Sequence, residues 1–157
     1  MITTIMRVLW LIALLQLIGP EAFATTCGPD DRTAQQKFED YSHIFVATIT
    51  SSKIGPKIVG VKSPYFWIIA KFQVDEAIKG NPRKIKDIRT RQMINPWDAA
   101  YRISITSDPA DLRPGARFLV FAEGRGSVEA GQCSPTQPVY GQYPLIVKLR
   151  EEKDRSL

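Results

Sequence analysis

The clearest pattern in this chain is an alternation of apolar and polar residues between positions 65 and 78 (YFWIIAKFQVDEAI), which predicts a β-strand. One face of this strand is apolar, and the other carries Lys71, Gln73 and Asp75. The alternation slips near Glu76 and Ala77. Because one inserted residue inverts the phase of a strand, this slip predicts a β-bulge.

Two further segments are almost continuously apolar and predict buried strands, residues 44–50 (IFVATIT) and 116–122 (ARFLVFA). The first of these is expected to be buried on much of both faces. Residues 84–91 (KIKDIRTR) and 101–106 (YRISIT) alternate and predict two more strands. Glycine and proline between positions 51 and 64 indicate turns around a short strand at 57–62.

Two segments have the spacing of amphipathic helices. Three apolar residues spaced four and three apart share one helical face: Ala34, Phe38 and Tyr41. This spacing predicts a helix of about ten residues, and Asp30 or Asp31 is expected to cap it. Residues 145–153 predict a terminal helix with Leu145 and Leu149 facing inward. Both helices are short, so each must pack against an apolar surface to be stable.

Together these elements indicate an all-β domain with a flanking N-terminal helix and a second helix at the C-terminus. Five or six strands in about 130 residues are typical of a small closed antiparallel β-barrel. A β-sandwich is the alternative architecture. The barrel is favoured because closing the sheet removes its unpaired edges.

The first 24 residues have the pattern of a secretory signal peptide. Arg7 precedes an apolar run at positions 8–18, and Ala22 and Ala24 lie at the −3 and −1 positions of a cleavage site. The run is shorter than the approximately 20 residues that a membrane-spanning helix needs. We therefore expect residues 25–157 to form one secreted or periplasmic domain that is not embedded in a membrane. An uncleaved membrane anchor is the alternative.

The chain contains only two cysteines, Cys27 and Cys133. In an exported protein, two cysteines are most simply explained by a disulfide bond. Such a bond would close a loop of roughly 100 residues, and the chain-entropy model assigns ~4.7 kcal/mol to a loop of that size. Two unrelated buried thiols are the alternative.

Four basic residues between positions 84 and 91 are candidate anion-binding residues: Lys84, Lys86, Arg89 and Arg91. The chain carries a formal net charge of +5, which suits anionic partners. Export favours polyanionic glycans or anionic lipid head groups over nucleic acid. The alternative is that these side chains form the solvated face of a strand and protect a sheet edge.

The sequence contains no arrangement typical of catalysis. His43 is the only histidine, and its neighbour Ser42 would point to the opposite face of a strand, so the two do not form part of a catalytic triad. One histidine and two paired cysteines cannot form a usual zinc site. Asp75 and Glu76 are adjacent on a strand and do not converge. We therefore expect no catalytic residues, metal or cofactor, and an enzyme is the least favoured class.

The order of several segments resembles a known family. They are Cys27 soon after the signal peptide, residues 42–49 (SHIFVATI), 72–80 (FQVDEAIKG), 112–122 (LRPGARFLVFA) and 131–133 (GQC). This order resembles the netrin-like domain of tissue inhibitors of metalloproteinases (TIMP-like), in its short bacterial exported form. The resemblance covers nearly all of residues 25–157. It implies a five-stranded OB-type Greek-key barrel with a disulfide from the N-terminal segment to a late cysteine.

The resemblance also implies a function. The inhibitors of this family chelate a protease's zinc through the free amino group and carbonyl of an N-terminal cysteine. Cleavage after Ala24 leaves Thr25 and Thr26 ahead of Cys27, so its nitrogen would be an amide and a poor ligand. We therefore expect a monomeric module that binds a protein partner, such as a protease, in an inhibitor-like manner. Its candidate binding residues are Cys27, Gly28, Pro29 and Trp97.

Overall fold

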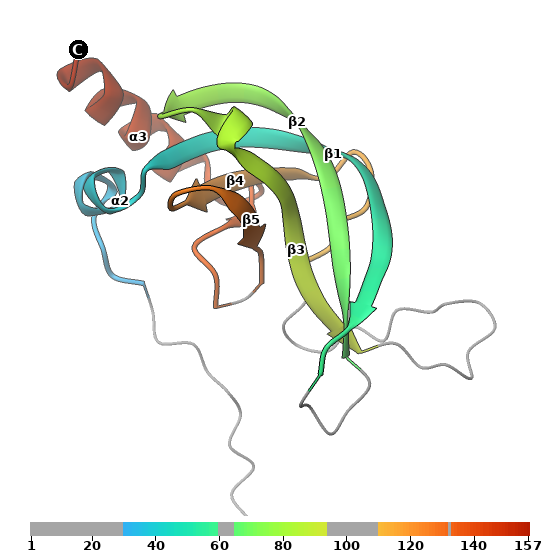
Figure 1. Cartoon of the computed structure of the whole chain (residues 1–157). Helices are drawn as coiled ribbons and strands as arrows, with labels where there is room; N and C mark the ends of the chain where they lie inside the picture. Colours follow the sequence, from blue (N-terminus) through green and yellow to red (C-terminus); the bar gives the residue numbers. More distant parts are fainter. Residues whose placement is uncertain (1–29, 60–64, 94–109, 132) are drawn as a thin grey trace, which may run out of the picture.

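The computed structural model describes residues 30–59, 65–93, 110–131 and 133–157 (Figure 1). Four candidate residues lie outside these ranges: Cys27, Gly28, Pro29 and Trp97. The predicted strand at 101–106 and the predicted signal peptide lie outside them as well. The described part is mostly β-structure, with one curled six-stranded sheet and two α-helices (Figure 1). The all-β class predicted from the sequence is therefore confirmed.

The sheet has the strand order β5-β3-β2-β1-β4-β6. Its strands are β1 (His43–Lys57), β2 (Tyr65–Lys79), β3 (Ile85–Met93), β4 (Arg117–Ala122), β5 (Gly126–Glu129) and β6 (Gln137–Pro138). All neighbouring pairs are antiparallel except β3 and β5, which run parallel. The sheet curls into a half-barrel around an apolar interior (Figure 1).

The first half of strand β1, residues 43–49, is buried on both faces, as the continuous apolar run there predicts, whereas residues 50–57 are largely exposed. Phe45, Ala47 and Ile49 point into the interior of the half-barrel, whereas Ile44 and Val46 belong to a second cluster on the outer face. Its partner β4 alternates in the same way between the two clusters. These two strands therefore form a wall that both apolar clusters share.

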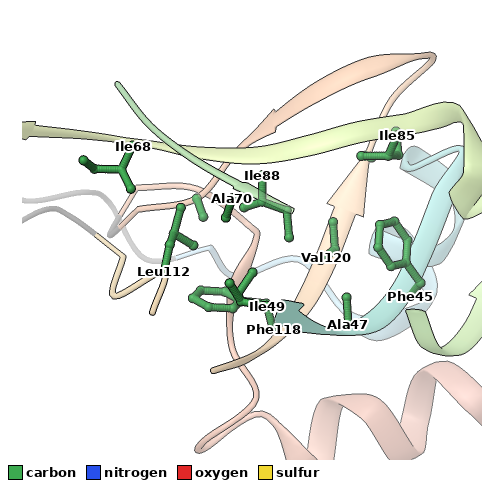
Figure 2. Close-up of a cluster of buried hydrophobic side chains, with 12 residues drawn as sticks. Phe45, Ala47, Ile49, Ile68, Ala70, Ile85, Ile88, Leu112, Phe118 and Val120 are labelled. Carbon is green, nitrogen blue, oxygen red and sulfur yellow. The ribbon is translucent and has the colours of Figure 1, made fainter. Parts of the chain in front are cut away.

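The interior cluster takes side chains from four strands, and Figure 2 shows how they converge. Phe118 and Val120 from β4 face Ile68 and Ala70 from β2, and Ile88 comes from β3 (Figure 2). Partly buried side chains on the predicted inner face of β2 pack against the cluster: Phe66, Phe72 and Val74. The inner face that the alternation predicts for β2 is thus confirmed.

The second cluster lies beneath the two helices, α2 (Ala34–Asp40) and α3 (Tyr143–Arg155). The helices contact each other on the outer side of the sheet (Figure 1). Ile146 and Leu149 of α3 are buried there, and Phe38 of α2 packs against the same cluster. The terminal helix and the apolar face of α2 are therefore both confirmed. No helix in the described ranges is long and apolar enough to span a membrane.

The predicted cap of α2 is wrong, because Thr33 begins the helix in place of Asp30 or Asp31. The Thr33 side chain accepts a hydrogen bond from the backbone N–H of Gln36, and the Gln36 side chain accepts one from Thr33. Asp30 instead forms ion pairs with Arg32 and Lys37. The helix has 7 residues rather than about ten, because the chain is already extended at Tyr41.

Strand β2 contains the bulges that the slip in its alternation predicts. Val46 pairs with Glu76 and Ala47 with Val74, so one residue of β2 is left over. A second shift lies between Ile44 and Phe45. These insertions rotate Ile78 into the outer cluster.

The turns predicted after position 51 are wrong up to Lys57, because β1 continues through Gly55 and Pro56. These two residues lie between the pairs Ile54–Ile68 and Lys57–Phe66, where the register shifts. Proline is tolerated in strands at such irregular positions.

Candidate functional site

A pocket of about 450 Å³ lies where the half-barrel is open, between β4 and β5. No strand pairing joins these two strands within the described ranges, although they follow one another in the chain. We call this the Cys133 pocket. Residues that define its walls are Tyr41, Arg91, Phe121, Val128, Glu129 and Cys133.

Local sequence explains how the two strands come to flank this opening. Gly124 and Gly126 adopt positive φ values of 64° and 108°, and the chain reverses between them. Strand β5 then runs parallel to β3, which places Val128 beside Ile88 and Glu129 beside Arg89. The sequence did not predict this parallel pairing.

The loop that follows β5 is held by side-chain hydrogen bonds. Ser134 Oγ donates to the Glu129 carbonyl oxygen at 2.5 Å, and Gln137 Nε2 donates to the Gly131 carbonyl at 2.8 Å. The buried Thr136 hydroxyl exchanges hydrogen bonds with the backbone of Phe121. The pocket wall that contains Cys133 is thus tied to β4 and β5.

The chemistry of the pocket is mixed. Phe121 and Val128 supply apolar surface, and Arg91 Nε donates to Glu129 Oε1 at 2.7 Å at the partly exposed rim. Arg89 forms a second ion pair behind the wall, at 2.7 Å from the buried Asp87. An apolar floor with a polar rim is typical of sites that receive a side chain of a partner.

Asp87 connects β3 to β5 beside the pocket. Its burial opposes ionisation, but hydrogen bonds from Arg89 and Ser127 outweigh that effect and hold the pKa of the Asp87 carboxyl below its ordinary value. The carboxylate is therefore charged at neutral pH and stabilises the parallel pair.

Within the described ranges, no group of three or more His, Cys, Asp and Glu side chains is arranged to hold a metal ion. Comparison with known protein families and with curated proteins finds no match to this sequence. The site therefore has to be interpreted from its own residues.

The structure describes one of the two cysteines and none of the candidate partner-binding residues. Cys133 lies in the pocket wall. Its expected disulfide partner Cys27, which is also a candidate binding residue, lies outside the described residues together with Gly28, Pro29 and Trp97. The disulfide bond and the binding role of these residues stay predictions.

The four candidate anion-binding residues do not share one environment. Arg89 pairs with Asp87 and Arg91 with Glu129, so both arginines have acidic partners. Lys84 ends the 3₁₀-helix η1 (Pro82–Lys84), and Lys84 and Lys86 are both exposed. The sequence did not indicate that Arg91 has an acidic partner, because Glu129 is 38 residues away along the chain.

His43 has a structural role, in agreement with its separation from any triad. The ring is buried, and its Nδ1 accepts a hydrogen bond from the Asn81 backbone N–H at 3.1 Å. Nε2 lies 2.9 Å from the carbonyl oxygen of Gly124. Both partners are backbone atoms in distant turns, and residue types alone give no signal for them.

Proposed function

We propose that this protein is an exported binding module that receives part of a partner protein in the Cys133 pocket. The observation that carries this proposal is the pocket itself, an opening of about 450 Å³ with apolar surface from Phe121 and Val128 and an ion-paired rim. It lies on a hydrogen-bonded loop and two strands, so little ordering is needed on binding. Preformed sites of this kind favour affinity because fewer groups lose freedom.

The finer fold that we propose is the five-stranded OB-type Greek-key barrel of netrin-like domains. Three features support it: β1, β2 and β3 form an antiparallel meander, β5 returns parallel to β3, and β4 pairs with the other edge of β1. The contact between β4 and β5 brings the two ends of this five-stranded order together. Strand β6 is then a two-residue addition beside β4.

An inhibitor-like mode follows if Cys27 bonds to Cys133. Such a bond would attach the N-terminal segment with Gly28 and Pro29 to the wall of the pocket. The partner would then contact that segment together with the rim formed by Arg91 and Glu129. A protease is one class of partner with an exposed site that such a segment fits, and export after cleavage of residues 1–24 would bring the two together.

Two glutamates provide a matched test of the pocket. Glu123 lines the pocket and Glu151 lies on α3, and both are exposed. Glu123→Arg and Glu151→Arg change the net charge equally, so a non-specific charge effect would appear in both. The wild-type protein serves as bait in an extracytoplasmic extract of the producing cells, and captured proteins are quantified. We expect Glu123→Arg alone to lose the partner; equal capture by all three proteins would refute the pocket as the binding site.

Measurement of the mature N-terminus separates the inhibitor mechanisms. A chain that begins at Cys27 has a free amino group that can chelate zinc, and it should inhibit metalloproteases in a fluorogenic peptide assay. A chain that begins at Thr25 should not inhibit through zinc. If the chain that begins at Thr25 inhibits, and an added residue at its N-terminus does not reduce that inhibition, the zinc-chelating mechanism is contradicted.

The alternative function, binding of polyanionic glycans or anionic lipids, rests on the exposure of Lys84 and Lys86. Because both arginines have acidic partners, we assign the attraction to the two lysines. Retention on heparin should fall with salt and should be lost in the double variant Lys84→Glu, Lys86→Glu. Failure of the wild-type protein to bind heparin or anionic vesicles at low salt would exclude this function.

A further inference from the structure

A second hollow, of about 660 Å³, lies between the turn that precedes β4 and the turn that precedes α3. Its lining includes Asp111, Arg113, Arg117, Tyr140 and Tyr143. We call it the Tyr140 groove. The described residues that line it are all different from those of the Cys133 pocket. Its volume is in the range of small-ligand sites, about 300–1,000 Å³.

Two tyrosines expose their side chains at this groove. Tyr140 is 94% exposed and Tyr143 is 61% exposed. The same short segment anchors itself in the outer cluster through Val139 and Ile146, which are both buried. The two tyrosines are therefore not part of the core, and exposed aromatic residues that gather at one hollow are typical of a binding site.

Backbone hydrogen bonds hold both sides of the groove in place. The Val139 N–H donates to the Arg117 carbonyl oxygen at 2.9 Å, which ties the tyrosine-bearing turn to β4. On the other side, the Gly115 N–H donates to the Ile49 carbonyl oxygen at 2.8 Å. The groove is thus formed before any ligand arrives, which lowers the entropic cost of binding.

The charged groups of the groove are matched. Arg113 Nε lies 3.0 Å from Asp111 Oδ2, and both side chains are more than half exposed. Arg117 Nε lies 3.1 Å from Asp75 Oδ2, which also accepts a hydrogen bond from the Thr48 hydroxyl at 2.8 Å. The two pairs offer hydrogen-bond donors and acceptors side by side, and their charges cancel. This arrangement suits an uncharged ligand that is rich in hydroxyl groups.

We propose that the Tyr140 groove binds neutral sugar residues of a glycan. A pyranose ring presents a face of C–H groups, which packs on an aromatic ring because the face of the ring is electronegative. The hydroxyl groups around the sugar both donate and accept, so the exposed Asp111–Arg113 pair can bind neighbouring hydroxyls through charge-assisted hydrogen bonds. The groove supplies both kinds of contact.

This proposal is independent of the two functions considered above. The partner of the Cys133 pocket is a protein, and the polyanion alternative depends on Lys84 and Lys86, which do not line the groove. A neutral sugar needs no excess of positive charge. Its binding should therefore be insensitive to salt, whereas binding of a polyanion weakens as salt rises.

Titration calorimetry of the exported protein with neutral tetrasaccharides of glucose, mannose, galactose and N-acetylglucosamine tests the proposal. We expect at least one of them to bind with a Kd below about 1 mM. Its affinity should be the same in about 0.02 M and about 0.3 M sodium chloride. Failure of every tetrasaccharide to bind, or an affinity that falls with salt, would overturn the proposal.

Two substitutions at Tyr140 separate sugar stacking from simple apolar contact. Tyr140→Phe keeps the aromatic ring and should keep most of the affinity. Tyr140→Leu keeps an apolar side chain without a ring and should weaken binding at least about tenfold. Both variants should fold normally, because the residue is 94% exposed. Equal affinity of the two variants would refute stacking on this ring.

A second pair of variants tests the polar contacts. Arg113→Met removes the hydrogen-bonding head group from the groove, and Arg125→Met removes the same charge from the exposed turn between β4 and β5. Only Arg113→Met should weaken binding, by about tenfold. An equal loss in both variants would contradict the site. Sedimentation of the free proteins provides the last check, because a wild-type dimer that Tyr140→Leu abolishes would assign the tyrosines to a second copy of the chain and overturn the proposal.

Discussion

Replacement of Gly80 by alanine should destabilise this protein strongly, and two separate effects contribute. Gly80 has a φ of 70°, a conformation that costs a residue with a Cβ about 1–2 kcal/mol. The new Cβ would also lie 2.1 Å from the Ser42 carbonyl oxygen and 2.4 Å from His43 Nδ1. The turn must therefore move, which breaks the hydrogen bonds of His43 with Asn81 and Gly124 at about 1 kcal/mol each.

The expected loss for Gly80→Ala is about 3–4 kcal/mol in the free energy of unfolding. Gly124→Ala is the matched control, because Gly124 has a similar φ of 64° but no heavy atom within 4 Å of the position that its Cβ would take. We expect the control to lose only the conformational part, about 1–2 kcal/mol. The difference between the two variants therefore isolates the close approach of the turn.

Urea unfolding measures both variants against the wild-type protein. With a slope of about 2 kcal/mol per M for a domain of this size, the midpoints of the two variants should differ by about 1 M. If Gly80→Ala is no less stable than Gly124→Ala, the close packing of this turn on His43 is refuted.

Three further predictions concern other contacts. Thr33→Ala removes the cap of α2 and should lower stability by about 1 kcal/mol in urea unfolding; an unchanged midpoint would contradict the cap. Arg150 donates two hydrogen bonds to Glu76 and so holds the pKa of the Glu76 carboxyl below its ordinary value of 4.5. The stabilisation by this pair is therefore fully present above pH 4.5 and is lost as the pH falls through the lowered pKa. The difference in free energy of unfolding between the wild-type protein and Arg150→Met should accordingly decrease below pH 4.5. A difference that does not change with pH would show that the Glu76–Arg150 pair does not cause it. If Cys27 and Cys133 are bonded, the non-reduced mature protein should weigh two hydrogens less than the reduced one, and reduction should cost up to ~4.7 kcal/mol; identical masses would disprove the bond.

The elements that the sequence predicts well are those whose signal is local. The continuous apolar run of β1 indicates two buried faces, and the slip near Glu76 indicates a bulge, because side-chain alternation reports directly on the faces of a strand. The cap of α2 also has a local signal. Thr33 and Gln36 have the spacing of a capping box, whereas an aspartate before a helix is compatible with several roles.

The elements that the sequence does not predict depend on distant partners. Strand β5 is only four residues long, and its parallel pairing with β3 has no local signal. This pairing places Glu129 beside Arg91, so one of the four predicted anion-binding residues forms an ion pair. The two hydrogen bonds of His43 likewise involve backbone groups 38 and 81 residues away. The candidate site is therefore a product of the sheet topology, and composition alone could not locate it.

The shared wall of β1 and β4 has a consequence for how the chain reaches its folded state. Both strands contribute side chains to the interior cluster on one face and to the cluster under the helices on the other. The two clusters therefore depend on the same pair of strands. Ile146 and Leu149, near the C-terminus, cover strands that begin at His43. Contacts of such long sequence separation slow folding. We therefore expect the sheet and the helices to fold together in one cooperative step that requires α3.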